Sequence, residues 1–219
     1  MPLVVRATVV DIRTDTPKIS DSFIVDTNVW LWLLYPPLTQ NSNGNQKQQA
    51  IDYPSYFKLA LAAKSKFYSS GLVFAELAHN IERTEKNIYD SNLASPLDLK
   101  DYRHDYPRQR AKVTTLINDA WSDILGFSEL LKINLDDAFM QEATALFPTV
   151  GLDGYDAFTA QAAIKTRVNV ITDDGDFASV PGLTVFTANA RVINVAAQSG
   201  MLVVRPNDDE PSSSKSSTV

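Results

Sequence analysis

The sequence contains no cysteine and only two histidines, His79 and His104. The absence of cysteine excludes disulfides, thiol nucleophiles and zinc sites built from thiolates. With so few histidines, a histidine-rich metal site is disfavoured as well. Any metal that this chain binds must therefore be held mainly by oxygen atoms.

Long apolar runs are also missing. No run approaches the ~18 residues of a membrane helix, and Arg6 and Asp11 interrupt the short apolar stretch near the N-terminus, which lacks the layout of a signal peptide. We therefore expect a cytoplasmic protein without a membrane partner. The 219 residues, of which 44% are apolar and 21% charged, have a globular composition and suffice for one hydrophobic core.

Short apolar strands alternate with helical segments along most of the chain. Strand-type runs occur at 23–25, 66–69, 168–171 and 183–186. Apolar residues at helical spacing fall between them, for example at 73, 77 and 81. This alternation predicts an α/β fold with a central, mostly parallel sheet flanked by helices.

We expect one domain over residues 23–200, preceded by an N-terminal strand and linker over 1–22. The stretch 39–49 is rich in Asn and Gln and cannot bury an apolar face, which predicts a polar, mobile insertion. The Ser-rich end of the chain predicts a disordered tail over 205–219. The region 85–125 is expected to form helices with breaks at its prolines.

Acidic residues follow two of the expected strands. Asp26 comes directly after 23–25, and the segment Thr-Asp-Asp-Gly-Asp-Phe, which contains Asp174 and Asp176, comes directly after 168–171. Because the carboxyl ends of parallel strands meet at one edge of a sheet, where such folds bind ligands, these acids should lie close together.

Two further acidic motifs lie in expected helices. Glu76 lies among apolar and small neighbours in the helix 72–83, which makes an inward-pointing side chain credible. Asp153 and Asp156 are three residues apart at a helix start and therefore share one face. Carboxylates that gather at one place repel one another and need a compensating cation, and oxygen ligands suit Mg²⁺ or Mn²⁺.

Each motif alone also has an ordinary structural explanation. Asp, Thr and Asn are common turn and N-cap residues, and acids favour the first turn of a helix. Three acids within 173–176 are harder to explain, because they repel one another and few structural needs require that arrangement. The coincidence of all four motifs, in this order, favours a functional site.

The order and the local sequences of these motifs resemble those of the PIN-domain ribonucleases, which include the toxins of many bacterial toxin–antitoxin pairs. That family carries Asp-Thr/Ser-Asn/Ser after its first strand, a Glu in a following helix, an Asp-Ala pair opening a later helix, and Thr-x-Asp-x-Asp-Phe after its fourth strand. The resemblance implies a three-layer PIN-like fold, a metal-dependent endoribonuclease, Mg²⁺ or Mn²⁺ as cofactor and RNA as substrate. The acidic residues that it implies as catalytic and metal-binding are Asp26, Glu76, Asp156 and Asp174, with Asp176 as a further metal ligand, and the supporting polar residues are Thr27, Asn28, Asp153 and Thr172.

The resemblance also implies the chemistry of the reaction. Two metal ions ~4 Å apart can activate water on one side of the phosphorus and stabilise the leaving oxygen on the other. Asp26 and Asp174 would be core ligands, and Asp156 and Glu76 would bind directly or through water. The products expected of the family are a 5′-phosphate and a 3′-hydroxyl.

Positive charge for substrate binding is concentrated in one segment. The net charge of −6 argues against binding of nucleic acid through overall charge, but not against a local basic groove. Residues 102–112 interleave aromatic residues with four cations, a pattern that can stack bases and bind phosphates. The predicted substrate-binding residues are Arg103, Arg108, Arg110 and Lys112. The alternative is a solvated helix face.

Two other functions compete with the nuclease. A haloacid-dehalogenase-type phosphatase also has an Asp after its first strand, but it needs a second Asp two residues later, where this chain has Asn28. A catalytically inert PIN-like RNA-binding protein would keep the acids only as helix caps, and the presence of all four weighs against it. The sequence leaves open which RNA is cut, the number of ions, and whether an antitoxin or a second copy of the chain is a partner.

Overall fold

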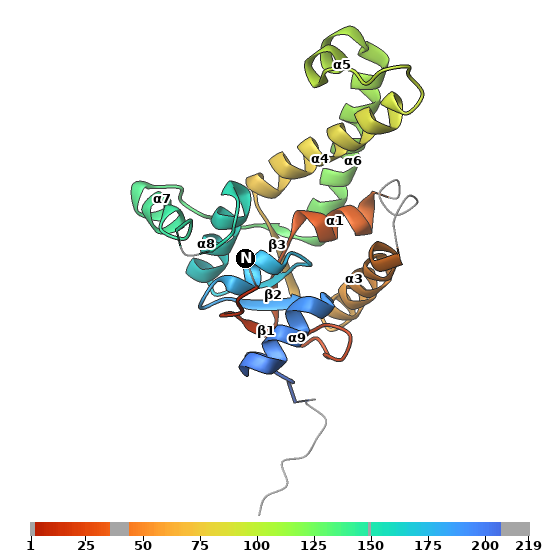
Figure 1. The fold of residues 1–219 in the computed structure, drawn as a ribbon. Helices are drawn as coiled ribbons and strands as arrows, with labels where there is room; N and C mark the ends of the chain where they lie inside the picture. The colour runs from red at the N-terminus through yellow and green to blue at the C-terminus, as the bar shows by residue number, and fades with distance from the viewer. Residues whose placement is uncertain (1–2, 36–43, 149, 207–219) are drawn as a thin grey trace, which may run out of the picture.

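A six-stranded parallel sheet forms the centre of the molecule (Figure 1). The computed structural model describes residues 3–35, 44–148 and 150–206. The strands lie in the order β1-β6-β5-β2-β3-β4, and neighbouring strands run parallel. They are β1 (Thr8–Asp11), β2 (Ser22–Val25), β3 (Lys66–Ser69), β4 (Glu129–Leu130), β5 (Asn169–Ile171) and β6 (Thr184–Thr187). The predicted α/β architecture with a parallel sheet is confirmed.

Helices cover both faces of this sheet and give three layers. One face is covered by α1 (Thr27–Leu34), α3 (Gly44–Ala62), α4 (Gly71–Asp90) and α6 (Pro107–Phe127). The other is covered by α7 (Asp137–Thr144), α8 (Gly154–Thr166) and the 3-10 segment η1 (Gly175–Ser179). The helix α9 (Ala190–Ser199) packs on β1 at the edge.

The central strands are apolar on both faces because both are buried. In β2, Phe23 and Val25 belong to the core under α1 and α3, whereas Ile24 belongs to the core under α8. The neighbouring β5 alternates in the same way, with Ile171 on the first face and Val170 on the second. This is the side-chain alternation of a strand placed between two helical layers.

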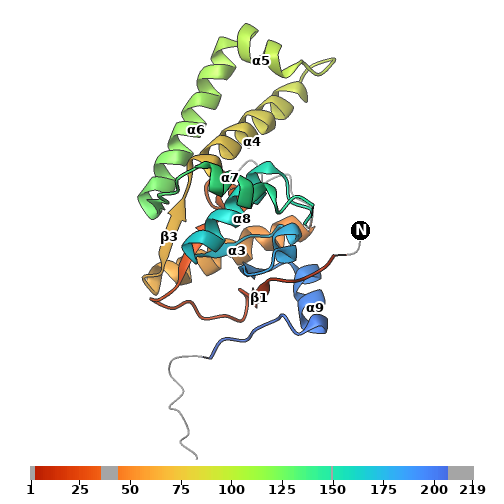
Figure 2. The same cartoon turned by 90° about the vertical axis from the view of Figure 1, so that its left-hand side faces the viewer.

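A helical arm extends from the sheet (Figures 1 and 2). It consists of α4 and α6, which pack along each other, and of α5 (Leu99–Asp105), which joins them at the tip. Pro107 starts α6, where its missing N–H leaves no helical hydrogen bond unmade. The expectation of broken helices over 85–125 is confirmed.

Three expected boundaries need correction. Strand β1 pairs with β6 inside the main sheet, so the N-terminal strand is not separate from the 23–200 domain. Residues 44–49 of the expected mobile insertion form the first turns of α3. Gln and Lys favour helix, and tertiary contacts can stabilise a helical segment that has few apolar residues. Residues 39–43 of the expected insertion lie outside the described residues. Arg205, expected to begin a disordered tail, is held by two buried carboxylates, and residues 207–219 of that expected tail lie outside the described residues.

Arg205 ties the C-terminal segment to the polar loop before β2. Its Nε and Nη1 atoms lie 2.7 Å from Asp15 Oδ1 and 2.6 Å from Asp21 Oδ1. The side chains of Asp15 and Asp21 are only 2% and 7% exposed. The guanidinium also lies 4.8 Å from the centre of the Phe186 ring.

Within the described ranges, no helix has the length and hydropathy of a membrane span.

Replacement of Arg205 is therefore expected to destabilise the fold. Arg205→Ala leaves Asp15 and Asp21 buried without their cation, which should cost about 3–5 kcal/mol of unfolding free energy. The matched control is Arg13→Ala, because Arg13 is 41% exposed and pairs with Asp11 at the surface, so it should cost under ~1 kcal/mol. Urea denaturation of both variants measures the difference. Equal losses would show that the Arg205 pairs have no special weight.

Candidate active site

Asp26 lies at the carboxyl end of β2 with its side chain turned toward β5. The pairing of Val25 with Ile171 brings the ends of the two strands level, and the Asp26 N–H donates to the Ile171 carbonyl at 3.0 Å. Asp26 occupies the N-cap position of α1, but its carboxylate caps no helix amide. Instead its Oδ2 accepts a hydrogen bond of 2.7 Å from the Thr172 hydroxyl. The ordinary N-cap explanation therefore does not apply to this carboxylate.

Thr172 links Asp26 to the acidic turn after β5. Its side chain is fully buried, and its hydroxyl oxygen also accepts the Asp174 N–H at 2.9 Å. Asp174 in turn accepts the Asp176 N–H at 2.8 Å and caps η1. One hydroxyl thus fixes two of the predicted acidic residues relative to each other.

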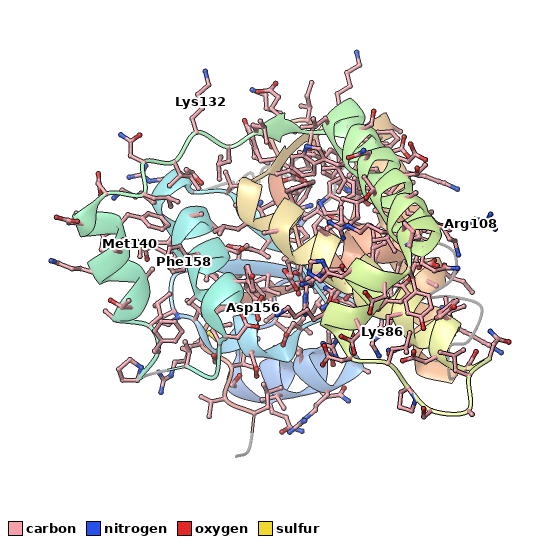
Figure 3. The ribbon with its side chains drawn as sticks, turned by 90° about the horizontal axis from the view of Figure 1, so that it is seen from above. Lys86, Arg108, Lys132, Met140, Asp156 and Phe158 are labelled. Atoms are coloured by element: carbon pink, nitrogen blue, oxygen red, sulfur yellow. The ribbon has the colours of Figure 1, made fainter. Side chains whose placement is uncertain are left out.

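Helices on both faces of the sheet supply the other two acids. Glu76, half-buried near the start of α4, accepts a hydrogen bond of 2.6 Å from the buried Thr27 hydroxyl. Asp153 caps α8 by accepting the Asp156 N–H at 3.0 Å, which places Asp156 in the first helical turn. Asp156 lies between α8 and the arm in the view from above (Figure 3). Asn28, by contrast, is exposed.

The four carboxyl groups share one electrostatic environment. Burial, together with the charges of Glu76 and Asp174, raises the pKa of Asp26 to about 7. Burial and the charges of Asp26, Asp153, Asp174 and Glu76 raise the pKa of Asp156 to about 8. Burial raises the pKa of Glu76 and of Asp174 as well, with Asp153 adding repulsion to both. The four motifs therefore converge at one edge of the sheet.

The donor chemistry of this cluster fits a hard divalent cation. Its side-chain donors are carboxylate oxygens, and the charges that raise their pKa values are negative. In the described part of the chain, however, no group of three or more His, Asp or Glu side chains is spaced to hold an ion without rearrangement. Binding an ion would require the side chains to draw closer together.

Three of the four cations in the segment predicted to bind substrate form ion pairs within the protein. Arg103 makes a two-point ion pair with the buried Glu82, and Arg110 lies 3.0 Å from the same carboxylate. Lys112 pairs with Glu85, whose other oxygen accepts a hydrogen bond of 2.6 Å from Tyr35. Their predicted role in substrate binding stays a prediction, and two buried glutamates of α4 give them a structural role as well.

Arg108 differs from the other three cations of this segment. It is exposed on the arm (Figure 3) and forms no ion pair within the described residues. In the described part of the chain it is therefore the one member of the predicted set without an ion-pair partner.

Sequence reasoning missed the residues that support the acidic turn from behind. The Tyr53 hydroxyl, buried on α3, lies 2.8 Å from Asp173 Oδ1 and 3.0 Å from the Thr172 carbonyl, and accepts the Ala188 N–H at 3.0 Å. Asn189 donates to the Asp173 carbonyl at 2.7 Å. Asn189 could have been found, because it follows the end of β6 at the same sheet edge. Nothing in the helical pattern around Tyr53 indicates where its hydroxyl reaches.

The sequence matches the PIN domain family over residues 23–183. The chain belongs to the PIN domain family. This is a family of nucleases, so the predicted resemblance is confirmed and the chain is assigned to nucleases at that level.

Solved structures also match this PIN domain. One of them is VapBC2 from Rickettsia felis bound to a DNA fragment from their promoter, at 14% identity and a TM-score of 0.45, with 76% of this chain and 98% of that chain covered. No curated protein matches the sequence.

The raised pKa values predict that this PIN domain loses stability as pH rises. An Asp in the unfolded chain has a pKa of about 3.9, whereas Asp26 and Asp156 reach about 7 and 8 in the fold. Between these limits the folded protein holds protons that the unfolded chain releases, so the free energy of unfolding falls from about pH 4 to pH 8. Thermal melts in EDTA across this range, for the wild type and Asp26→Asn, measure the effect. The variant should show the weaker dependence, and identical curves would contradict the pKa shift of Asp26.

Tyr53 is predicted to support the acidic turn through its hydroxyl alone. Tyr53→Phe keeps the ring, which stacks on Trp32 at 5.1 Å, but leaves the buried Ala188 N–H without its acceptor. Loss of such a partner should cost about 1–3 kcal/mol in a denaturation experiment. The control is Tyr155→Phe, since Tyr155 is 41% exposed and should lose little. Unchanged stability in Tyr53→Phe would contradict this role.

Proposed function

We propose that this PIN domain is a divalent-metal-dependent endoribonuclease. The observation that carries the proposal is the convergence of Asp26, Glu76, Asp156 and Asp174, each of which has its pKa raised by burial and by neighbouring negative charge. A fold gains no stability from repelling carboxylates, because each raised pKa corresponds to lost stability at neutral pH. Such a cluster is expected where the charges serve a ligand.

The same helix shows what an acid with a structural role looks like. Glu82, six residues beyond Glu76 on α4, is buried and has its pKa lowered by hydrogen bonds and charge from Arg103 and by the charge of Arg110. The pKa of Glu76, by contrast, is raised, mainly by its burial. This contrast within one helix supports a cation-binding role for Glu76.

The ligands in this proposal are Asp26, Glu76, Asp156 and Asp174, with Asp176 at the rim. Mg²⁺ or Mn²⁺ bound there would activate water and stabilise the leaving oxygen of the phosphodiester. The remaining polar residues orient these ligands. The Thr172 hydroxyl donates to one oxygen of Asp26, and the Thr27 hydroxyl donates to one oxygen of Glu76. Asp153 begins α8 at the position that turns Asp156 toward the cluster.

Family membership favours the nuclease over the phosphatase alternative. The second Asp that a haloacid-dehalogenase-type phosphatase needs would occupy position 28, where this chain has an exposed Asn. RNA as the substrate, and an antitoxin as the partner, belong to the proposal through the family resemblance. A catalytically inert RNA-binding protein is distinguished from the nuclease by the cleavage experiment that follows.

Asp26→Asn is expected to abolish RNA cleavage. The amide keeps an oxygen for the Thr172 hydroxyl but removes the charge that binds the ion, so activity should fall by more than the ~10- to 100-fold that loss of a ligand's hydrogen-bond partner costs. The matched control is Asp119→Asn, the same change at an exposed position of α6. Gel assays of a labelled RNA with Mg²⁺, Mn²⁺ or EDTA provide the measurement. Wild-type protein that leaves RNA intact with either metal, or a variant as active as wild type, would overturn the proposal.

A further inference from the structure

A cleft of about 690 Å³ opens beside the acidic site. Part of its wall is Asp174 and η1, with Gly175, Asp176 and Ser179, and the rest comes from three segments outside the four motifs. These are the N-terminal residues before β1, residues 147–148 and 150–151 between α7 and α8, and the N-cap and first turn of α9. The N-terminal segment and α9 lie together at one edge of the molecule (Figure 2). The cleft is therefore continuous with the site but built from other parts of the chain.

Two arginines bring positive charge to this cleft. Arg6 precedes β1 and Arg191 lies in the first turn of α9, and both side chains are exposed. Their backbones are fixed, because the Arg6 N–H donates to the Ala178 carbonyl at 2.8 Å and the Arg191 N–H donates to Asn189 Oδ1 at 3.1 Å. Within the described residues neither guanidinium forms an ion pair, in contrast to Arg103 and Arg110 of the arm. Their charges are therefore available to an anionic ligand.

The same cleft has an apolar wall. Phe147 is 42% exposed and lines it together with Val4 and Val150. An exposed aromatic ring beside cations is the combination that binds single-stranded nucleic acid, in which a base stacks on the ring and the phosphates contact the cations. A duplex cannot use such a wall, because its bases are already stacked on one another.

We propose that this cleft binds unpaired RNA adjacent to the bond that is cut, with Arg6 and Arg191 contacting backbone phosphates and Phe147 stacking on a base. The inference rests on the proposed function, since it names the substrate form that the acidic site would receive. It assigns phosphate binding to the N-terminal segment and α9 rather than to the paired cations of the arm.

Binding is measured separately from cleavage. A fluorescently labelled single-stranded RNA of mixed sequence is titrated with the full-length protein in EDTA, at several salt concentrations, and anisotropy gives the dissociation constant. Arg6→Ala combined with Arg191→Ala should weaken binding and flatten the plot of log K against log salt by about 1.4, because each lost phosphate contact on a single strand contributes about 0.7. Lys58→Ala removes an exposed cation of α3 that does not line the cleft, and it should leave both quantities unchanged.

Phe147 gives an independent test of base stacking. Phe147→Ala should weaken binding by on the order of tenfold with no change in the salt slope, since stacking involves no charge. Phe147→Trp should restore the affinity. A blunt-ended duplex of the same RNA with its complementary strand should bind more weakly than the single strand and should not respond to Phe147→Ala.

The outcomes separate this inference from the proposed function. Unchanged affinity and salt slope in the double arginine variant, or equal binding of single strand and duplex, would overturn the cleft while leaving metal-dependent cleavage by the wild type intact. Loss of binding in the variants together with no cleavage by the wild type under Mg²⁺ or Mn²⁺ would support the cleft and overturn the nuclease. Thermal melts of each variant verify that the fold is retained.

Discussion

The pairing of β2 with β5 is the constraint on which the acidic site depends. Because the strands run parallel with Val25 opposite Ile171, the next residues, Asp26 and Thr172, meet where the sheet ends. A register shift of one residue would send every following side chain to the other face of the sheet. The buried alternation of Phe23, Ile24 and Val25 opposes such a shift, since each side chain fits one of two different cores. The hydrophobic pattern of three residues thereby fixes the geometry of a polar site.

The buried carboxylates of this fold have two kinds of hydrogen-bond partner, basic side chains or neutral donors. Glu82 and Glu85 of α4, and Asp15 and Asp21 before β2, are matched by basic side chains that reach them from distant parts of the chain. The acids at the ends of β2 and β5 receive hydroxyl and amide donors instead, which orient the carboxylates without cancelling their charge. Neutral donors preserve the charge that a cation would need. The acids of the first group stabilise the fold, whereas those of the second group destabilise it.

Sequence reasoning succeeded where position along a strand determines position in space. Asp26 and Asp174 could be placed at one edge because parallel strands end together, and Glu76 and Asp156 because helical spacing and first-turn positions are visible in the sequence. It failed where the partner is set by tertiary packing. The pairing of Arg103 with Glu82 joins residues 21 positions apart on two helices of the arm, and the contact of Tyr53 with Asp173 spans 120 positions. The composition of residues 44–49 predicted a loop, but polar residues can form a helix that tertiary contacts support. The composition around Arg205 predicted disorder, but this side chain has buried partners.

The Arg205 ion pairs have a consequence for synthesis of the chain. They join residues 190 and 184 positions apart, so they close nearly the whole length of the described protein. Synthesis of the chain produces Asp15 and Asp21 at 190 and 184 residues before Arg205, and N-terminal parts fold first during translation. The loop before β2 therefore lacks this counterion until Arg205 has been synthesised. Closure of this edge through Arg205 follows the synthesis of all six strands of the sheet, and a chain cut before residue 205 would keep Asp15 and Asp21 without this cation.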